Sequence, residues 1–190
     1  AAANVKSRLS ARGFKEMGIG WYRRTLTPDP SWRQRRVMLE FGGIMLVGDV
    51  YLNGSRIGGS EYGYVPFGID ISKDLKYGQE NVIVVKADTR NANNSRWYTG
   101  GGLFRNVSLM ITPREIFFDR HPLFVTTSHN DTVHVTATIA NYGKTKDGIV
   151  TARVLDANGK VVVVSNTDLK YFRRKKINEY KLNDIPLPNA

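Results

Sequence analysis

Apolar and polar residues alternate along much of the chain with a period of two, the pattern of a β-strand that buries one face. The clearest example lies in the first half, where Val37, Leu39 and Phe41 alternate with Met38 and Glu40. Because successive side chains of a strand point to opposite faces, we expect the first three residues to pack into a core and the other two to face outward.

Three further signals place strands in the first half. Residues 50–57 read Val-Tyr-Leu-Asn-Gly-Ser-Arg-Ile, and Asn53 with Gly54 tolerates the positive φ angles that a tight type I′ hairpin turn requires. Residues 82–85 are a continuous β-branched run, as expected of a strand in the middle of a sandwich. Apolar residues alternate again in residues 107–113, whose final Thr-Pro we expect to end both the strand and the domain.

The second half shows the same pattern at a different spacing, without an internal repeat of the first. In residues 133–139 the apolar side chains share one face, which predicts a half-buried antiparallel strand. Residues 149–155 and 161–164 flank Asp-Ala-Asn-Gly and predict a second hairpin. Short strands at this spacing suggest an immunoglobulin-like sandwich. The tail at residues 185–188 stops before any closing strand, so we expect the chain to end within this domain.

No long helical period is present, and the nearest one, residues 10–17, is too short to form a stable helix alone. A length of 190 residues leaves room for two modest sandwiches. The pattern therefore predicts an all-β chain with two layers in each half.

The charge balance raises nucleic acid as a partner, since 28 Lys and Arg residues stand against 17 Asp and Glu residues, a formal net charge of +11. The basic residues are spread over both halves, and only residues 170–176 form a cluster. A strand there would send successive charges to opposite faces, so we interpret the cluster as a solvated strand end or loop. We expect no nucleic-acid partner.

The sequence has no cysteine, which excludes disulfides, thiolate metal sites and cysteine nucleophiles and leaves the compartment open. It also has no run of about 18 apolar residues and no apolar export signal at its start. We therefore expect a soluble chain with no membrane partner.

The carboxylates show no catalytic pair. A retaining glycosidase needs two of them, about 5 Å apart and facing one cleft. Glu40 falls on the polar face of a strand, Asp49 opens a hairpin and Glu61 lies in a glycine-rich loop, so we interpret each as solvated. The histidines do not have metal-ligand spacing, and we predict no metal site for His121, His129 and His134. Residues 100–102 are glycines that lack the Lys-Ser/Thr of a phosphate loop, so no nucleotide cofactor is expected.

Aromatic residues give the first half its most distinctive feature, and the set comprises Trp21, Trp32, Tyr62, Tyr64, Trp97, Tyr98 and Phe104. Aromatic faces stack on the C–H faces of sugars, while Asn, Arg and Asp side chains bond the hydroxyls. Trp21 lies in a run typical of a strand, and we expect it to pack in the core. Residues 93–97 form a polar loop ending in Trp, for which core packing and sugar contact both stay open.

Six segments carry a more specific signal, namely residues 18–26 (Gly-Ile-Gly-Trp-Tyr-Arg-Arg-Thr-Leu), 36–43 (Arg-Val-Met-Leu-Glu-Phe-Gly-Gly), 50–54 (Val-Tyr-Leu-Asn-Gly), 63–72 (Gly-Tyr-Val-Pro-Phe then Asp-Ile-Ser), 78–83 (Gly-Gln-Glu-Asn-Val-Ile) and 95–107 (Ser-Arg-Trp-Tyr-Thr-Gly-Gly-Gly-Leu-Phe-Arg-Asn-Val). In this order and spacing they resemble the N-terminal sugar-binding domain of glycoside hydrolase family 2, with the closest likeness to bacterial β-galactosidases. Residues 114–188 resemble, more loosely, the immunoglobulin-like domain that follows in this family.

The resemblance implies a jelly-roll β-sandwich in residues 1–113, an immunoglobulin-like β-sandwich in residues 114–190, and then a TIM barrel carrying an acid/base Glu and a nucleophile Glu. A barrel needs about 250 further residues. We therefore expect this chain to be a non-catalytic portion, inactive alone, of an enzyme that hydrolyses terminal β-D-galactosides with retention. The resemblance also implies a homo-oligomeric bacterial parent, periplasmic or cytoplasmic, whose own barrel is a partner of this chain, and no cofactor.

In this family the loop before the aromatic motif reaches the mouth of the active site. By position, the resemblance assigns sugar contact to Asn94, Ser95, Arg96, Trp97 and Tyr98. Well-known members carry an acidic residue just ahead of the aromatic, where this sequence has Ser95 and Arg96. The alternative function is a free-standing carbohydrate-binding module or lectin, which rests on the same aromatic residues.

The end of the same motif has a structural interpretation that needs no resemblance. The glycines at residues 100–102 permit the positive φ angles and close approach that return a loop to a strand. The rigid guanidinium fork of Arg105 can tie loop carbonyls or a carboxylate.

Overall fold

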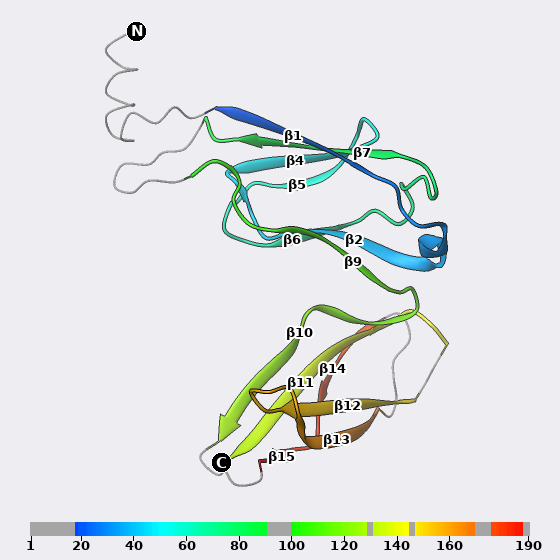
Figure 1. The fold of residues 1–190 in the computed structure, drawn as a ribbon, viewed down its shortest axis with the longest axis vertical. Coiled ribbons are helices and arrows are strands. Elements are labelled where there is room, and N and C mark those ends of the chain that lie inside the picture. The colour runs from blue at the N-terminus through cyan, green and yellow to red at the C-terminus, as the bar shows by residue number, and fades with distance from the viewer. Residues whose placement is uncertain (1–17, 91–99, 129–130, 145–146, 170–175, 188–190) are drawn as a thin grey trace, which may run out of the picture. The chain divides into compact units, whose positions relative to one another are not determined.

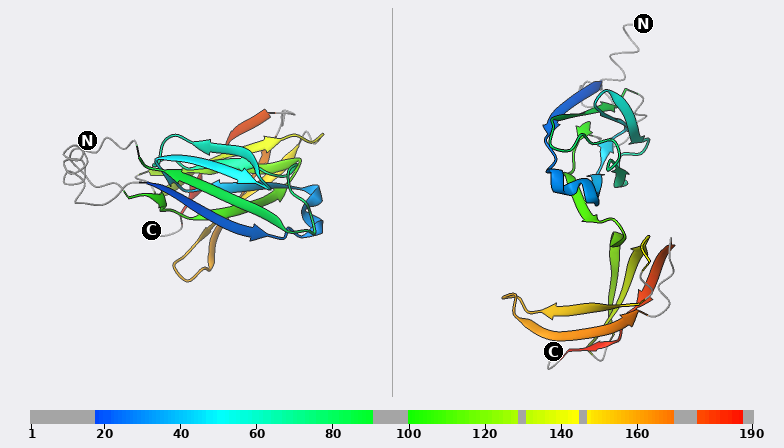
Figure 2. Two further views of the ribbon diagram at one scale, coloured as in Figure 1. Left: turned by 90° about the horizontal axis from the view of Figure 1, so that it is seen from above. Right: turned by 90° about the vertical axis from the view of Figure 1, so that its right-hand side faces the viewer.

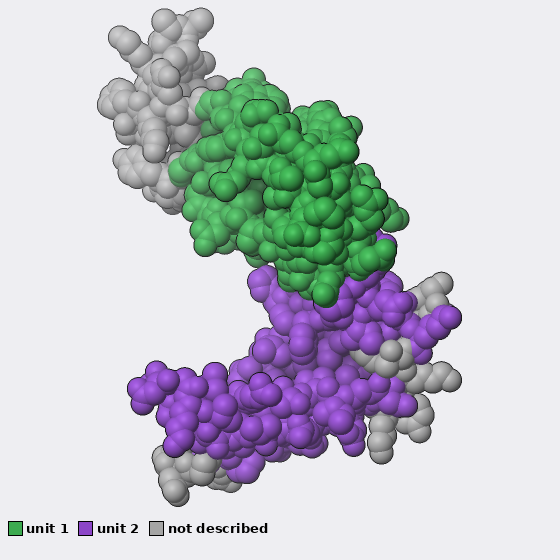
Figure 3. Space-filling view, turned by 45° about the vertical axis from the view of Figure 1, so that its right-hand side comes forward, with its two compact units in different colours: residues 1–112 green, residues 113–190 purple. Residues whose placement is uncertain are grey.

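The computed structural model describes residues 18–90, 100–128, 131–144, 147–169 and 176–187, and over these residues nearly all regular structure is β-strand (Figure 1). The chain divides into two compact units, residues 1–112 and 113–190 (Figure 3). The prediction of an all-β protein is confirmed. Among the described residues, no helix is both long and apolar enough to cross a membrane.

The first unit has two facing layers of antiparallel strands (Figure 1). The larger sheet has the order β1-β7-β4-β5, formed by β1 (Ile19–Leu26), β7 (Asn81–Asp88), β4 (Val47–Leu52) and β5 (Ser55–Ser60). The opposite layer has the order β6-β2-β9, formed by β6 (Phe67–Asp70), β2 (Arg35–Phe41) and β9 (Val107–Pro113). Within its described residues the unit also contains a short pair, β3 (Ile44–Met45) with β8 (Gly102–Leu103), and a 3₁₀ turn, η1 (Pro30–Gln34).

The core of the first unit lies between these layers. Val37, Leu39 and Phe41 are at most 3% exposed, as predicted, and they join buried residues of the larger sheet such as Val50. Met38, expected to face outward, is also buried. Because β2 pairs along both edges, with β6 and β9, side chains of both neighbours surround a residue on its outer face and cover it more than alternation alone predicts.

The predicted Asn-Gly hairpin joins β4 to β5. Asn53 and Gly54 have φ angles of 51° and 88°, as a type I′ turn requires. The Asn53 side chain accepts a hydrogen bond from the Val82 amide and donates one to Oδ1 of Asn81, which is fully buried. The turn is thereby fastened to the start of β7, so local turn chemistry and sheet order reinforce each other.

Trp21 does not pack in the core as predicted, because its side chain is 61% exposed. It lies on β1 opposite Lys86 of β7, which in turn lies opposite Asp49 of β4. Directly opposed residues share a face of the sheet, and this face points away from the buried residues. Trp32, in η1, packs at the edge of the core instead.

The second unit also has two layers. β10 (Ile116–Ser128), β11 (Thr132–Asn141) and β14 (Lys176–Lys181) form one sheet, with β15 (Ile185–Pro186) also paired to β11, and β12 (Gly148–Leu155) with β13 (Val161–Leu169) forms the other. The β12–β13 pair crosses over the larger sheet (Figure 2).

Two predictions for this unit are confirmed: the β12–β13 hairpin and the apolar face of β11, where Ala137 and Ile139 are buried. The tail differs from expectation, since Ile185 is 1% exposed and forms the short strand β15. The basic cluster at residues 170–176 and the short helical period at residues 10–17 lie almost wholly outside the described residues.

Replacing Val37 with Ala should lower the free energy of unfolding by about 2–3 kcal/mol, because two buried methyl groups are lost and a cavity is left. Val65→Ala makes the same deletion at a side chain that is 53% exposed, and should change stability by less than about 0.5 kcal/mol. Urea unfolding of both variants measures the difference. Equal losses would contradict the assignment of the core.

Candidate functional site

One end of the first unit gathers the start of β4, the end of β7 and the short strand β8. Asp88, the last residue of β7, pairs with Ile19 of β1 and with Val47 of β4. The chain leaves the larger sheet there and next forms β8, which pairs with β3, and the connection between β7 and β8 contains the predicted sugar-contacting residues. These lie outside the described residues, and so stay predictions: Asn94, Ser95, Arg96, Trp97 and Tyr98. The site is therefore built from the contacts that hold the two ends of this connection.

The outgoing end is anchored by Thr89, which is only 4% exposed. Its amide donates to the Gly18 carbonyl at 2.9 Å. Its hydroxyl donates to the same carbonyl at 3.0 Å and accepts from the Gly18 amide at 3.2 Å. Three hydrogen bonds thus join the exit of β7 to the residue that precedes β1.

The next residue adds a second anchor through Asp88. Arg90 donates from Nε to Oδ1 at 3.0 Å, from Nη2 to Oδ2 at 2.7 Å, and from its backbone amide to Oδ1 at 3.1 Å. The side-chain hydrogen bonds from Arg90, followed by the backbone hydrogen bond, lower the pKa of Asp88 to about 2. This carboxylate is charged at neutral pH and cannot act as a general acid there.

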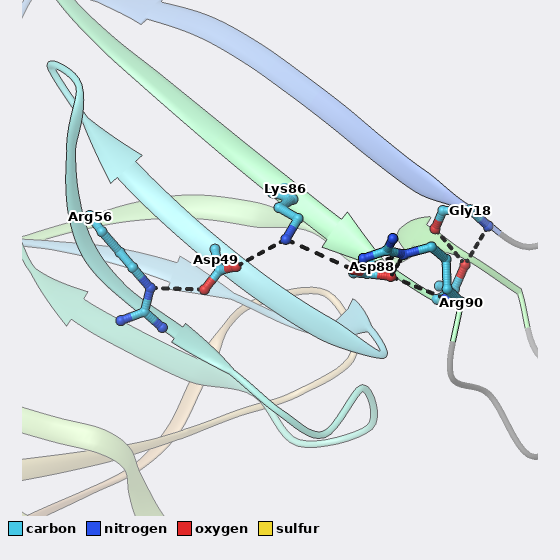
Figure 4. A network of polar contacts seen from close by, with 7 residues as sticks. Gly18, Asp49, Arg56, Lys86, Asp88 and Arg90 are labelled. Carbon is cyan, nitrogen blue, oxygen red and sulfur yellow. Dashed lines mark hydrogen bonds and ion pairs between the residues drawn. The ribbon is translucent and has the colours of Figure 1, made fainter.

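The charges continue across the sheet as a chain of ion pairs (Figure 4). Lys86 Nζ lies 3.8 Å from Oδ2 of Asp88 and 3.7 Å from Oδ2 of Asp49. Arg56 donates from Nε to Oδ1 of Asp49 at 2.8 Å. Asp49 was expected to be solvated, but its side chain is only 20% exposed and is held by two cations. We call these five residues the charged ladder: Arg56, Asp49, Lys86, Asp88 and Arg90.

The returning end is shaped by glycine. Gly102 has a φ of +82°, and a side chain there would overlap the hydroxyl of Tyr22. A Cβ at Gly101 would lie 3.4 Å from Cγ2 of Thr89, so the two ends of the connection pass close together. The predicted need for positive φ and close approach is met at Gly102, whereas Gly100 has open space around it.

Arg105 ties neighbouring loops together, as predicted. Its Nη1 donates to the Gly42 carbonyl at 3.3 Å and to the Tyr64 carbonyl at 3.2 Å. The guanidinium carbon also lies 5.0 Å from the centre of the Phe104 ring. One side chain therefore holds two segments that are distant from it in the sequence.

These loops present an aromatic cluster of Tyr62, Tyr64 and Phe104, each between 42% and 58% exposed. Tyr64 lies edge-on to both neighbours, with ring centres 5.7 Å from Tyr62 and 6.2 Å from Phe104. Exposed aromatic rings held in fixed orientation suit stacking on sugar rings.

The remaining candidate carboxylates and histidines of the described residues lie in different surroundings. Glu61 is exposed, as predicted, while Glu40 is half-buried. His134 Nδ1 lies 2.7 Å from Oδ1 of Asp184, a pair that sequence spacing did not reveal. Within the described ranges, no cluster of three potential metal ligands occurs.

Sequence reasoning missed the Thr89 anchor and the Asp88–Arg90 pair. The available signal was Asp-Thr-Arg at residues 88–90, shortly after the β-branched run at residues 82–85, at the exit of a central strand where functional loops often begin.

Comparison with known proteins gives a family match. Residues 10–113, more than half of the chain, match the family described as "Glycosyl hydrolases family 2, sugar binding domain".

Relatives with curated names are glycosidases of two kinds. A β-galactosidase of Bacteroides ovatus is 34% identical over 150 residues, which are 76% of this chain and 18% of that protein. A β-galactosidase of Thermoanaerobacter pseudethanolicus is 31% identical over 180 residues, 89% of this chain and 24% of that protein. A β-glucuronidase of Bacteroides fragilis is 32% identical over 114 residues, 57% of this chain and 16% of that protein. The chain thus spans a quarter or less of the length of these relatives.

Solved structures agree. A crystal structure of a glycosyl hydrolase family 2 member from Bacteroides cellulosilyticus has a TM-score of 0.81 and 30% identity, covering 94% of this chain and 24% of that one. A β-glucuronidase of Bacteroides uniformis has a TM-score of 0.70 at 21% identity, covering 90% of this chain and 22% of that one, and it supports the fold alone.

Gly102→Ala should destabilise the first unit by about 1–3 kcal/mol, because Ala at positive φ is strained and its Cβ would displace Tyr22. Gly100→Ala, which meets no atom within 4 Å, should change stability by less than about 0.5 kcal/mol. Chemical unfolding of the two variants checks this contrast. A Gly102→Ala variant as stable as the unchanged protein would contradict the close approach of Gly102 to Tyr22.

Arg90→Ala should raise the pKa of Asp88 from about 2 toward its ordinary value near 4. Since the folded pKa is lowered, Asp88 contributes stability above about pH 4 that is lost as the pH falls toward 2, and the variant should lose this contribution. NMR titration of the Asp88 carboxyl carbon measures the shift. Arg35→Ala, in the opposite layer, should leave that pKa unchanged, and an unchanged value in Arg90→Ala would disprove the anchor.

Proposed function

The chain belongs to glycoside hydrolase family 2, and from this premise we propose that it forms the non-catalytic N-terminal part of a β-galactosidase. In this proposal residues 1–113 are the jelly-roll sugar-binding domain and residues 114–190 an immunoglobulin-like domain. The observation that carries the proposal is the family match over residues 10–113, in the unit that anchors both ends of the 91–99 connection.

The catalytic carboxylates are assigned to a barrel elsewhere in the parent enzyme. A retaining mechanism needs one carboxyl group that is protonated near neutral pH and a second as nucleophile. Asp88 has a lowered pKa, and Asp49 is held between Arg56 and Lys86. Asp88 therefore does not suit the acid, and in this proposal the role of the chain is to bind and orient the sugar.

Sugar contact is assigned to the 91–99 connection, at Asn94, Ser95, Arg96, Trp97 and Tyr98. The support is that both ends of this connection are held in place. Three hydrogen bonds join Thr89, just before it, to Gly18, and Gly102, just after it, packs on Tyr22. Fixed ends reduce the conformational entropy that a loop loses when it closes on a ligand.

The galactoside is favoured by the likeness of the six motifs and by the β-galactosidases among the relatives. β-Glucuronides are the second candidate substrates, because β-glucuronidases occur among the relatives too. Homo-oligomerisation of the parent belongs to the same proposal and rests on the resemblance. A free-standing carbohydrate-binding module is the alternative function, supported by the exposed cluster of Tyr62, Tyr64 and Phe104.

The full-length parent should hydrolyse a chromogenic β-galactoside with a kcat/KM at least about tenfold above that for the matching β-glucuronide, whereas the 190-residue chain alone should hydrolyse neither. In the parent, Trp97→Ala should raise KM several-fold, because it removes contact with bound sugar. Phe118→Ala, an exposed aromatic of the second unit, is the matched control and should leave KM unchanged.

Three results would count against the proposal. Turnover by the purified 190-residue chain would show that it is catalytic. Preference of the parent for the glucuronide would make β-glucuronides, in place of β-galactosides, its substrates. An unchanged KM in Trp97→Ala would remove the 91–99 connection from the sugar site.

A further inference from the structure

The outward face of the β1-β7-β4-β5 sheet carries side chains that the proposed function leaves without a role. Trp21, Lys86 and Asp49 lie directly opposite one another on β1, β7 and β4, and therefore share this face. Tyr51 and Arg23 follow two residues farther along, both opposite Val84, and share it too.

Two aromatic rings, together with Ile19 and Val47 opposite Asp88, form the apolar part of this face. Trp21 is 61% exposed, and its ring centre lies 6.2 Å from that of Tyr51 with the planes inclined by 36°. An indole this exposed contributes little to folding, since its apolar area stays in water. Neighbouring aromatic rings on one face of a sheet offer stacking surface for a chain of sugar rings.

Beside the rings lies the charged ladder, whose central members are already ordered (Figure 4). The side chains of Lys86, Asp49 and Asp88 are only 24%, 20% and 17% exposed, and they hold one another in ion pairs. Polar groups fixed before the ligand arrives lose little entropy on binding, so they can recognise a polar ligand efficiently.

The net positive charge of this face favours sugars that carry carboxylates. Four basic residues stand on or at the end of this face against two carboxylates: Arg23, Arg56, Lys86 and Arg90 against Asp49 and Asp88. This excess agrees with the net charge of +11 of the whole chain. Arginine forks and a lysine ammonium recognise carboxylates with charge-assisted hydrogen bonds.

The face suits a glycan better than a protein. Specific protein interfaces bury about 800 Å² on each side around an apolar centre poor in charge. Here the centre holds the Asp49–Lys86–Asp88 ion pairs, and the two large rings lie beside them.

We propose that this sheet face binds an oligosaccharide bearing carboxylates, a chain of uronic acid residues, with its sugar rings on Trp21 and Tyr51 and its carboxylates facing the basic residues. The inference rests on the proposed function only for the class of ligand, a glycan. The face ends at Asp88, the last residue of β7.

The test is calorimetric titration of the 190-residue chain with tetragalacturonate and with its fully methyl-esterified form, which keeps the rings and removes the charge. We expect the acid to bind at least about tenfold more tightly than the ester, and the affinity to fall as salt rises. Trp21→Ala should weaken binding at least about tenfold and Lys86→Met several-fold. Phe118→Ala should leave it unchanged, and circular dichroism should show all variants folded.

Several outcomes would overturn the inference. Equal binding of acid and ester would show that charge is not recognised. Binding that Trp21→Ala does not weaken, or no binding at all, would show that this face is not the binding site. Concentration-dependent self-association abolished by Trp21→Ala would make the face an interface between copies. Binding here is measured without hydrolysis, so its failure leaves the galactosidase result for the parent standing, and failure of that assay leaves this binding result standing.

Discussion

The pairing of β7 on both edges is the constraint on which the rest of the first unit depends. Hydrogen-bonded to β1 and β4 along its length, β7 cannot slip by one residue without exchanging its two faces. Its inward residues Val85 and Ala87 are buried in the core, while outward Lys86 and Asp88 form the middle of the charged ladder. One register therefore sets the core, the ion pairs and the point where the 91–99 connection begins.

Features that depend only on residues close together in the sequence could be predicted from it. The Asn53–Gly54 turn needs positive φ at two neighbouring positions, and the alternation around Leu39 marks one buried face, so local chemistry decides both. The prediction that Trp21 packs in the core was wrong for a definable reason. Trp21 and Tyr22 are consecutive aromatics on an edge strand, and a period of two cannot tell which of them faces the opposite layer.

The site could be predicted only in part. The role of Arg105 followed from its donor geometry, whereas the Thr89–Gly18 contact joins residues 71 positions apart and depends on which strands become neighbours. The same holds for the Asp49–Lys86 ion pair of the charged ladder, which joins β4 to β7. The sugar contacts of residues 94–98 remain predictions.

The closely spaced ends of the 91–99 connection, at Thr89 and Gly101, have an evolutionary consequence. A connection whose two ends are held by a folded β-sandwich can accept substitutions or insertions at small cost to folding, because the entropy of loop closure grows only slowly with loop length. Under the proposed function, selection can alter the sugar contacts by changing residues 91–99 without changing the sandwich. A shared scaffold under enzymes named for different sugars is the result that such modularity favours.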